Sequence, residues 1–140
     1  MVVDVIIPCF NEKERIVNVV SVLKEVKSIK KIIIVDDGST FETKKILDTF
    51  SDVQIVTHDR NMGKTLAIKS GLMQNDTNAV LFVDADIKGL RNMDVERMIQ
   101  LSENVDMVLG IRDEGLVLSM LTGFSQAYTG ERVVSRSTGG

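Results

Sequence analysis

Five short runs of apolar and β-branched residues recur along the chain and predict the strands of a sheet. They cover residues 2–8, 31–36, 52–57, 79–84 and 105–110. Each run is nearly continuous in its apolar character, without alternation, which is typical of strands in a parallel sheet that is covered on both faces. The pattern therefore predicts a mostly parallel sheet with helices on both sides.

The intervals between these runs carry apolar residues at three- and four-residue spacing, which predicts amphipathic helices. The first two helical intervals open with the spacing of a capping box, Asn11 with Glu14 and Ser39 with Glu42. Strands that alternate with helices indicate an α/β fold with right-handed crossovers. Two further helical patterns follow, over residues 63–73 and 94–101.

Composition limits the class of protein. The 140 residues are 44% hydrophobic and 26% charged, which fits a single globular domain over residues 1–140, without an internal repeat or linker. The net charge of -3 offers no broad basic surface for nucleic acid. No apolar run approaches the roughly 20 residues of a membrane span, and no basic leader opens the chain. We expect a cytoplasmic protein with at most peripheral contact at the cytoplasmic membrane face.

Polar residues gather where the predicted strands end. Such residues follow the first four strands at positions 11–12, 36–37, 61–64 and 84–86. In an open α/β sheet these ends converge on one crevice, at the point where the strand order reverses and ligands bind. The sequence therefore predicts one polar site built from four loops. Taken singly, each segment is also ordinary turn and helix-cap chemistry.

The acidic pair Asp84 and Asp86, separated by Ala85, follows the most apolar of the runs. The spacing allows both carboxylates to address one cation. Hard oxygen ligands are what Mg²⁺ or Mn²⁺ prefers, and they leave coordination positions for water and a diphosphate. The alternative is that the two acids only cap the helix that follows.

The acidic pair Asp36 and Asp37 allows two interpretations. Asp37 and Ser39 are suited to cap the next helix, with Gly38 supplying a positive φ, whereas Asp36 is suited to accept from a nucleobase N–H. Lys64 stands at a predicted helix N-terminus, which favours an anion such as phosphate. It is otherwise an ordinary exposed lysine.

Four segments together resemble the family 2 glycosyltransferases of GT-A fold. They are residues 6–12 (IIPCFNE), 34–40 (IVDDGST), 61–64 (NMGK) and 83–86 (VDAD). The resemblance implies a Rossmann-like, mostly parallel sheet with helices on both faces. It also implies that Asp84 and Asp86 are the catalytic residues, because they hold Mg²⁺ or Mn²⁺ on the donor diphosphate. The nucleotide-binding residues that it implies are Pro8, Asn11, Glu12, Asp36, Asp37, Gly63, Lys64, Asp84, Ala85 and Asp86.

A shorter segment, residues 129–132 (TGER), is similar to the branch that makes polyprenyl-phosphate sugars and to glucosyl-phosphoglycerate synthases. It suggests Arg112, Glu131 and Arg132 as contacts for an anionic acceptor, because a guanidinium binds phosphate at two points. The processive synthase branch is not expected, since the chain has no Trp. The chain is shorter than the family's usual extent, so we expect either a truncation at the C-terminus or a partner, such as a second copy, that completes the site.

The expected function is metal-dependent transfer of a sugar from a nucleoside-diphosphate sugar, UDP-linked, to an acceptor such as polyprenyl phosphate. One alternative is a truncated domain that binds nucleotide without transfer. A remote alternative is a P-loop NTPase, although His58 stands where that loop requires glycine. The apolar stretch over residues 116–124 is suited to a lipid chain, a dimer contact or a buried core helix.

Overall fold

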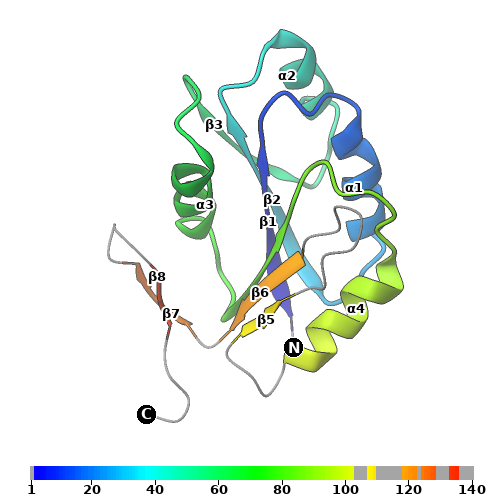
Figure 1. Cartoon of the computed structure of the whole chain (residues 1–140), viewed down its shortest axis with the longest axis vertical. Helices are drawn as coiled ribbons and strands as arrows, with labels where there is room; N and C mark the ends of the chain where they lie inside the picture. The colour runs from blue at the N-terminus through cyan, green and yellow to red at the C-terminus, as the bar shows by residue number, and fades with distance from the viewer. Residues whose placement is uncertain (1, 103–106, 110–117, 123, 129–132, 136–140) are drawn as a thin grey trace.

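The structure is a computed structural model that describes residues 2–102, 107–109, 118–122, 124–128 and 133–135, with side chains for residues 2–102 (Figure 1). A six-stranded sheet and a two-stranded sheet are present in this described part. The elements are β1 (Val3–Cys9), α1 (Arg15–Leu23), β2 (Ile29–Asp37), α2 (Phe41–Leu47), β3 (Gln54–His58), α3 (Lys64–Leu72), β4 (Ala79–Val83), α4 (Asn92–Leu101), β5 (Met107–Leu109), β6 (Leu118–Thr122), β7 (Phe124–Tyr128) and β8 (Val133–Ser135).

The large sheet has the strand order β3-β2-β1-β4-β6-β5. β2 pairs in parallel with both β1 and β3, and β1 also pairs in parallel with β4. The chain therefore builds outward from β1 to β3 and then returns to place β4 on the other side of β1. This reversal next to β1 confirms the predicted mostly parallel sheet and puts the ends of β1 and β4 at its switch point.

β6 is antiparallel to both of its neighbours, β4 and β5. Residues 118–122 therefore form a strand, and the core helix expected over residues 116–124 is wrong for this part of it. The physical reason is hydrogen bonding: a strand inserted between two others pairs its backbone on both sides. The strand predicted near 105–110 is present as β5, but β6 separates it from β4.

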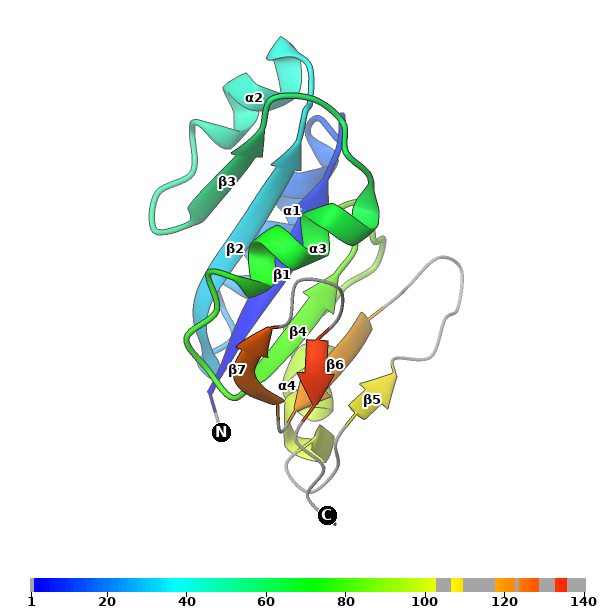
Figure 2. The same cartoon turned by 90° about the vertical axis from the view of Figure 1, so that its left-hand side faces the viewer.

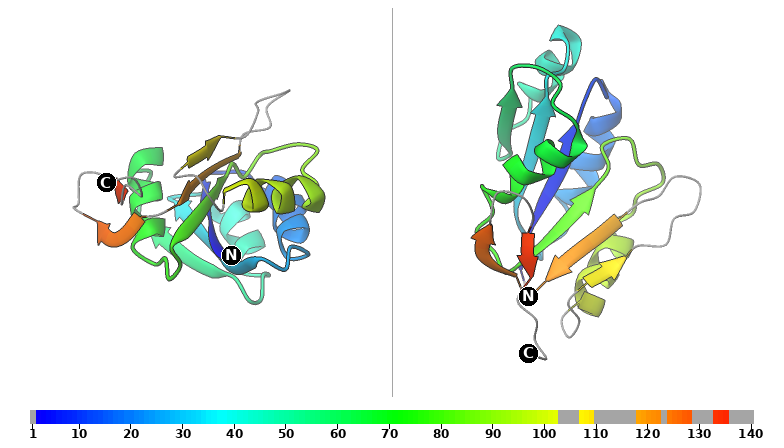
Figure 3. Two further views of the ribbon diagram at one scale, coloured as in Figure 1. Left: turned by 90° about the horizontal axis from the view of Figure 1, so that it is seen from below. Right: turned by 60° about the vertical axis from the view of Figure 1, so that its left-hand side comes forward.

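Helices cover both faces of the sheet, as Figures 2 and 3 show. One face packs buried residues of α1, α2 and α4 against Val5 and Ile7 of β1. The opposite face packs Ala67 of α3 against Ile6 and Ile33. Alternate residues of β1 thus enter different cores, which is why the run had to be continuously apolar.

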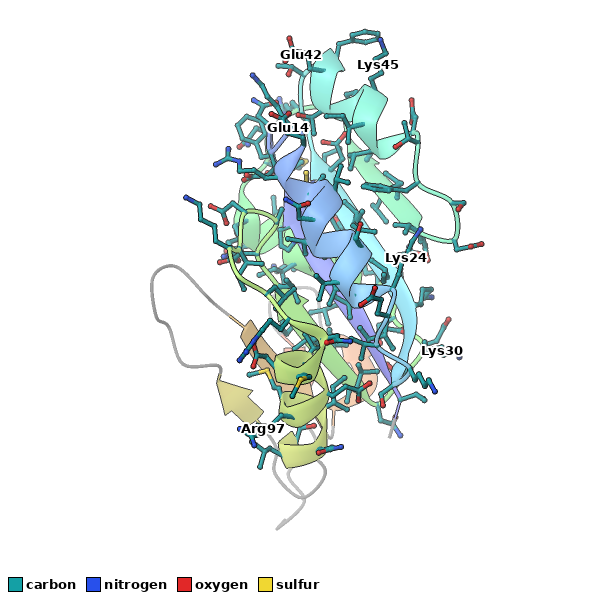
Figure 4. All side chains as sticks on the ribbon, turned by 90° about the vertical axis from the view of Figure 1, so that its right-hand side faces the viewer. Glu14, Lys24, Lys30, Glu42, Lys45 and Arg97 are labelled. Atoms are coloured by element: carbon teal, nitrogen blue, oxygen red, sulfur yellow. The ribbon has the colours of Figure 1, made fainter. Side chains whose placement is uncertain are left out.

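Exposed charged side chains lie around α1 and α4, among them Glu14 at the start of α1 and Arg97 on α4 (Figure 4). Both predicted capping boxes are wrong. α1 begins at Arg15 with Glu14 as its N-cap, and α2 begins at Phe41, and neither N-cap side chain makes a cap hydrogen bond. The polar residues expected to cap them instead join the two loops to each other, as described below.

Among the helices in the described part of the chain, none is long and apolar enough to cross a membrane.

Candidate functional site

A cavity of ≈ 410 Å³ opens at the carboxyl ends of the parallel strands, a size suited to a small-molecule ligand. Its walls come from the ends of β1 and β2, from the loops after β1, β3 and β4, and from α3. The structure thus brings together residues of all four polar segments that the sequence singled out. The lining residues are Pro8, Cys9, Phe10, Glu12, Asp37, Asn61, Gly63, Lys64, Ala67, Asp84, Ala85 and Asp86.

Two of the ten residues expected to bind nucleotide, Asn11 and Asp36, are absent from this lining. Asn61, one of the polar residues expected to gather at a strand end, does line the cavity. Sequence reasoning missed three further lining residues: Phe10 is exposed, whereas Cys9 and Ala67 are buried. Only proximity to the predicted polar residues could have suggested Phe10, and Cys9 and Ala67 carry no polar signal.

Asn11 joins the loop after β1 to the loop after β2. Its backbone N–H donates to the Ser39 hydroxyl at 3.0 Å, and its side-chain oxygen accepts from the Thr40 N–H at 2.8 Å. Asn11 has φ 54°, a left-handed conformation that asparagine tolerates better than most residues. These contacts explain why Asn11 and Ser39 do not cap helices.

Asp36 is almost fully buried beneath the same loop. One of its oxygens accepts from the Ser39 N–H at 2.9 Å and the other from the Lys44 ammonium at 3.2 Å. A buried carboxylate requires such partners to offset its lost hydration. In this structure Asp36 therefore holds the turn after β2 to α2.

Asp37 holds the loop after β3 against the end of β2. Oδ1 accepts from the Met62 N–H at 2.8 Å, and Oδ2 accepts from the Gly63 N–H at 2.9 Å. Gly38 permits this close approach, since it has φ +77° as predicted and a Cβ there would lie 2.3 Å from the carbonyl carbon of Arg60. The loop that carries Gly63 into the cavity is thus positioned by β2.

Asp37 also bonds His58 Nδ1, at 2.8 Å. Burial by itself would raise the pKa of Asp37, but the hydrogen bonds from His58 and from the Met62 and Gly63 amides outweigh it and hold the pKa below its usual value. Asp37 is therefore an anion at neutral pH. From the sequence, His58 stands out only as a departure from the P-loop pattern, because the pairing of β2 with β3 that places it opposite Asp37 is not visible there.

Three carboxylates influence one another at the mouth of the cavity. Burial raises the pKa of Glu12, and so do the negative charges of Asp86 and Asp84, while Arg15 acts in the opposite direction. Glu12 Oε2 is buried and lies 3.3 Å from the Arg15 guanidinium, yet no described donor makes a hydrogen bond with it. The site therefore concentrates negative charge that is only partly compensated.

Asp84 and Asp86 follow β4 as predicted, and Asp84 Oδ1 accepts from the Lys64 ammonium at 3.0 Å. Asp84 thus already binds a cationic group, and Asp86 is exposed beside it. No group of three His, Cys, Asp or Glu in the described part of the chain has the arrangement of a complete metal site. Two hard carboxylates with an under-compensated third nearby nevertheless fit Mg²⁺ or Mn²⁺, which binds protein through one or two carboxylates and fills its other positions with water and phosphate.

Lys64 is the first residue of α3, as the sequence predicted, and Gly63 precedes it with φ 98°. The free N–H groups of a helix start favour an anion at this wall of the cavity. Cys9 forms another part of the wall. Burial raises the pKa of its thiol to about 12, so it behaves as a small apolar side chain and not as a nucleophile.

The residues expected to contact an acceptor, Arg112, Glu131 and Arg132, lie outside the described residues. The described cavity therefore corresponds only to the donor side of the expected site.

Comparison with solved structures supports the same architecture. A mannosyltransferase from Pyrobaculum calidifontis, in complex with GDP-Man and Mn²⁺, superposes with a TM-score of 0.72 at 17% identity, over 89% of this chain and 48% of that one. Glucosyl-3-phosphoglycerate synthase from Mycobacterium tuberculosis, in complex with Mn²⁺, UDP and phosphoglyceric acid, gives 0.71 at 21% identity, over 81% of this chain and 44% of that one. At these identities the likeness shows the fold, which is the expected GT-A type.

Comparison of sequences gives the family. An undecaprenyl-phosphate 4-deoxy-4-formamido-L-arabinose transferase from Proteus mirabilis is 29% identical over 121 residues, which are 79% of this chain and 36% of that protein. The chain spans half or less of the length of the curated relatives it matches. The family description "Glycosyl transferase family 2" matches residues 4–129. The chain, with its carboxylate-lined cavity at the switch point of an α/β sheet, therefore belongs to glycosyl transferase family 2.

Proposed function

We propose that the chain binds a UDP-linked sugar in the cavity and, with a divalent cation, takes part in transfer of that sugar to an acceptor. The observation that carries the proposal is the convergence of Asp84, Asp86 and Lys64 on one cavity wall, beside the start of α3. This combination offers ligands for a cation and donors for a diphosphate in the same place. Family membership also sets aside the P-loop NTPase alternative.

The residues have separate roles in the proposed reaction. Asp86 and Asp84 hold the cation, and Lys64 with the first N–H groups of α3 binds diphosphate oxygens. A bound Mg²⁺ or Mn²⁺ supplies Lewis-acid stabilisation of the charge that develops on the leaving diphosphate. Because Lys64 and a cation compete for the same Asp84 oxygen, we expect cation binding to release Lys64 towards the phosphates.

Recognition of the base is assigned to Asp37. A carboxylate accepts about four hydrogen bonds, and the described donors to Asp37 number three: His58, Met62 and Gly63. The remaining acceptor position suits the imide N–H of uracil, and also the N1–H of guanine. Asp36, Asn11 and Pro8 were expected to share in this pocket, and of these Pro8 alone lines the cavity.

The test is thermal unfolding with nucleotide and metal. Wild type should be stabilised by UDP with Mn²⁺, by about 2.7 kcal/mol at a hundredfold excess over Kd. Asp86→Ala should keep its unliganded melting temperature and lose the metal-dependent part of this gain. Asp48→Ala is the matched control, since Asp48 is an exposed acid at the end of α2 outside the cavity.

A full metal-dependent shift in Asp86→Ala would refute the metal assignment. GDP in place of UDP distinguishes the bases, because the solved relatives contain GDP-Man in one case and UDP in the other. Stabilisation by ATP alone would instead favour a nucleotide-hydrolysing site.

The proposed acceptor is a phosphate, such as polyprenyl phosphate, bound near Arg112, Glu131 and Arg132. A phosphate acceptor is already an anion at neutral pH, so its attack on the sugar needs no general base. The name of the Proteus mirabilis relative supports a polyprenyl phosphate acceptor. Peripheral contact with the cytoplasmic membrane face and a homodimer belong to the same proposal.

A second candidate function is donor binding without transfer, which is favoured by a cavity whose described lining offers ligands for a cation and a diphosphate, Asp84, Asp86 and Lys64. Transfer of radiolabelled sugar to polyprenyl phosphate and to 3-phosphoglycerate separates the two, in wild type and Arg132→Ala. Labelled lipid that disappears in Arg132→Ala supports the phosphate acceptor. Binding of UDP and Mn²⁺ with no transfer to either compound supports the donor-binding domain.

A further inference from the structure

Three polar side chains from three different elements form a continuous hydrogen-bonded chain behind the cavity. Asp37 at the end of β2 bonds His58 Nδ1 at 2.8 Å, and His58 Nε2 lies 2.7 Å from the Ser70 hydroxyl in α3. The side chains of Asp37 and His58 are only 5% and 10% exposed. The arrangement therefore connects the end of β2 with the last turn of α3 through a largely buried path.

The chemistry of the three side chains determines which of their atoms donate hydrogen bonds and which accept them. An ionised carboxylate only accepts hydrogen bonds, so His58 Nδ1 carries the proton that bonds Asp37. The Ser70 hydroxyl, which can both donate and accept, makes the other hydrogen bond of the ring, at Nε2. Asp37 thus fixes which nitrogen of His58 carries the proton, Ser70 holds the opposite end of the ring, and His58 restrains the orientation of Asp37.

Neither His58 nor Ser70 lines the cavity, whereas Asp37 does. An Asp–His–Ser sequence of contacts also occurs in serine hydrolases, but here the hydroxyl belongs to a residue within α3 and outside the cavity lining. The structure therefore offers no reason to treat Ser70 as a nucleophile. The hydrogen-bonded series ends instead at Asp37. Its carboxylate lines the cavity and accepts from the Met62 and Gly63 amides.

We propose that His58 and Ser70 are positioning residues for the nucleotide: through Asp37 they fix the base-binding carboxylate and the loop that leads into Lys64. The inference rests on the proposed donor site and assigns two residues to it that make no contact with the ligand. Loss of either residue lets the Asp37 carboxylate rotate, which misaligns both the base contact and the helix start that faces the diphosphate. The cation ligands Asp84 and Asp86 lie on a different loop, which meets this path through the ion pair between Asp84 and Lys64.

The experiment measures UDP affinity by calorimetry, in the presence of Mn²⁺, for wild type, Ser70→Ala, His58→Leu and His58→Asn. His58→Leu should raise the Kd for UDP roughly tenfold, as expected for a lost hydrogen bond to a charged group. Ser70→Ala should weaken binding by a smaller factor. His58→Asn should recover part of the loss, because its amide N–H₂ lies where Nδ1 donates.

A second readout needs no ligand. Hydrogen exchange at the Met62 and Gly63 amides should accelerate in His58→Leu and return towards the wild-type rate in His58→Asn. Ser21→Ala is the matched control, since Ser21 is also a helical serine, and its hydroxyl bonds the Val17 carbonyl of its own helix α1. It should change neither measurement.

The outcomes separate this inference from the function on which it rests. If wild type binds neither UDP nor GDP, the donor site itself is wrong. If wild type binds and a folded His58→Leu binds equally well with unchanged amide exchange, the positioning role is refuted. Equal losses in His58→Leu and His58→Asn refute it as well, because they indicate packing and not donation to Asp37. If His58→Leu binds Mn²⁺ more weakly than wild type when no nucleotide is present, the substitution disrupts the site in general. This result would count against the positioning role as well.

Discussion

At the scale of single residues, the carboxylates of Glu12, Asp84 and Asp86 lie close enough for their charges to repel one another, and the nearby positive groups balance this repulsion only in part. Glu12 shows this most directly, because burial and the charges of Asp86 and Asp84 all raise its pKa. A carboxyl with a raised pKa in the folded state stabilises the fold at low pH, and this contribution is lost as the pH rises through the folded value. At neutral pH the Glu12 charge therefore works against folding.

We expect Glu12→Gln to raise the melting temperature at pH 7 when no metal is added. The gain should shrink below the ordinary carboxyl pKa of 4.5, where wild-type Glu12 is protonated as well. It should also shrink when Mn²⁺ is added at pH 7, because a cation at Asp84 and Asp86 cancels the field that opposes the Glu12 charge. Thermal unfolding across pH, with and without Mn²⁺, measures all three effects.

Glu25→Gln is the control for this prediction, because Glu25 is an exposed acid at the end of α1, outside the cavity lining. Its substitution should leave the melting temperature nearly unchanged with or without metal. A Glu12→Gln variant that is less stable than wild type at pH 7 would mean that the Arg15 ion pair outweighs the repulsion from the two aspartates.

At the scale of elements, the approach of α3 to the sheet depends on a missing side chain. A Cβ at Gly71 would lie 2.6 Å from Cγ2 of Ile6, a methyl on a β-branched side chain that has little freedom to move. α3 carries Lys64 at its start, so this contact also sets the distance between the helix start and the strand ends.

Gly71→Ala should therefore destabilise the protein. Overpacking costs about 1–3 kcal/mol, while replacing a helical glycine by alanine returns about 1 kcal/mol, so the net loss is up to about 2 kcal/mol. Urea unfolding measures it. Asn18→Ala, at an exposed position of α1, provides the propensity gain without the clash and should be neutral or slightly stabilising. A stabilised Gly71→Ala would show that α3 has room to move away from β1.

The helices show how far sequence patterns predict secondary-structure elements. Periodicity predicted all four helices, because each buries one apolar face regardless of its neighbours. The capping boxes were wrong for a tertiary reason. Asn11 and Ser39 have the residue types of caps, but they bond each other's loops, since the ends of β1 and β2 lie side by side in the sheet.

At the scale of the whole molecule, the order of the strands differs from their order in the chain. β6 enters between β4 and β5, where Met120 stands opposite Leu81 on one side and Val108 on the other. β5 and β6 thus extend the same sheet that carries the site, and the edge of β4 is paired.

Met120→Pro should prevent stable folding of this part of the sheet, because proline removes a ladder N–H inside a strand that is paired on both sides. We expect a loss of about 1–3 kcal/mol, the cost of leaving a buried backbone partner unsatisfied, measured by urea unfolding. Met120→Val keeps the N–H and a strand-forming side chain, and should cost far less. If Met120→Pro unfolds at the same urea concentration as wild type, β6 contributes little to the stability of the sheet.

The sequence by itself determined the features that arise from local pattern. Apolar runs predicted β1 to β4 and their parallel arrangement, and polar residues at strand ends predicted one polar site at the switch point. The resemblance to family 2 glycosyltransferases added ten nucleotide-binding residues, of which eight line one cavity. The prediction of the sheet succeeds because burial on two faces and the shared direction of parallel strands impose a pattern on the residues themselves.

Only the tertiary structure decided which polar groups face the cavity and which support it. Asp36 and Asp37 are adjacent in sequence, yet Asp36 turns to Ser39 and Lys44 while Asp37 turns to His58 and the cavity. Successive side chains of a strand point to opposite faces, so their partners depend on elements that are distant in the chain. The position of β6 was likewise undetermined, because an apolar run specifies burial and does not specify which strand edge it will pair with.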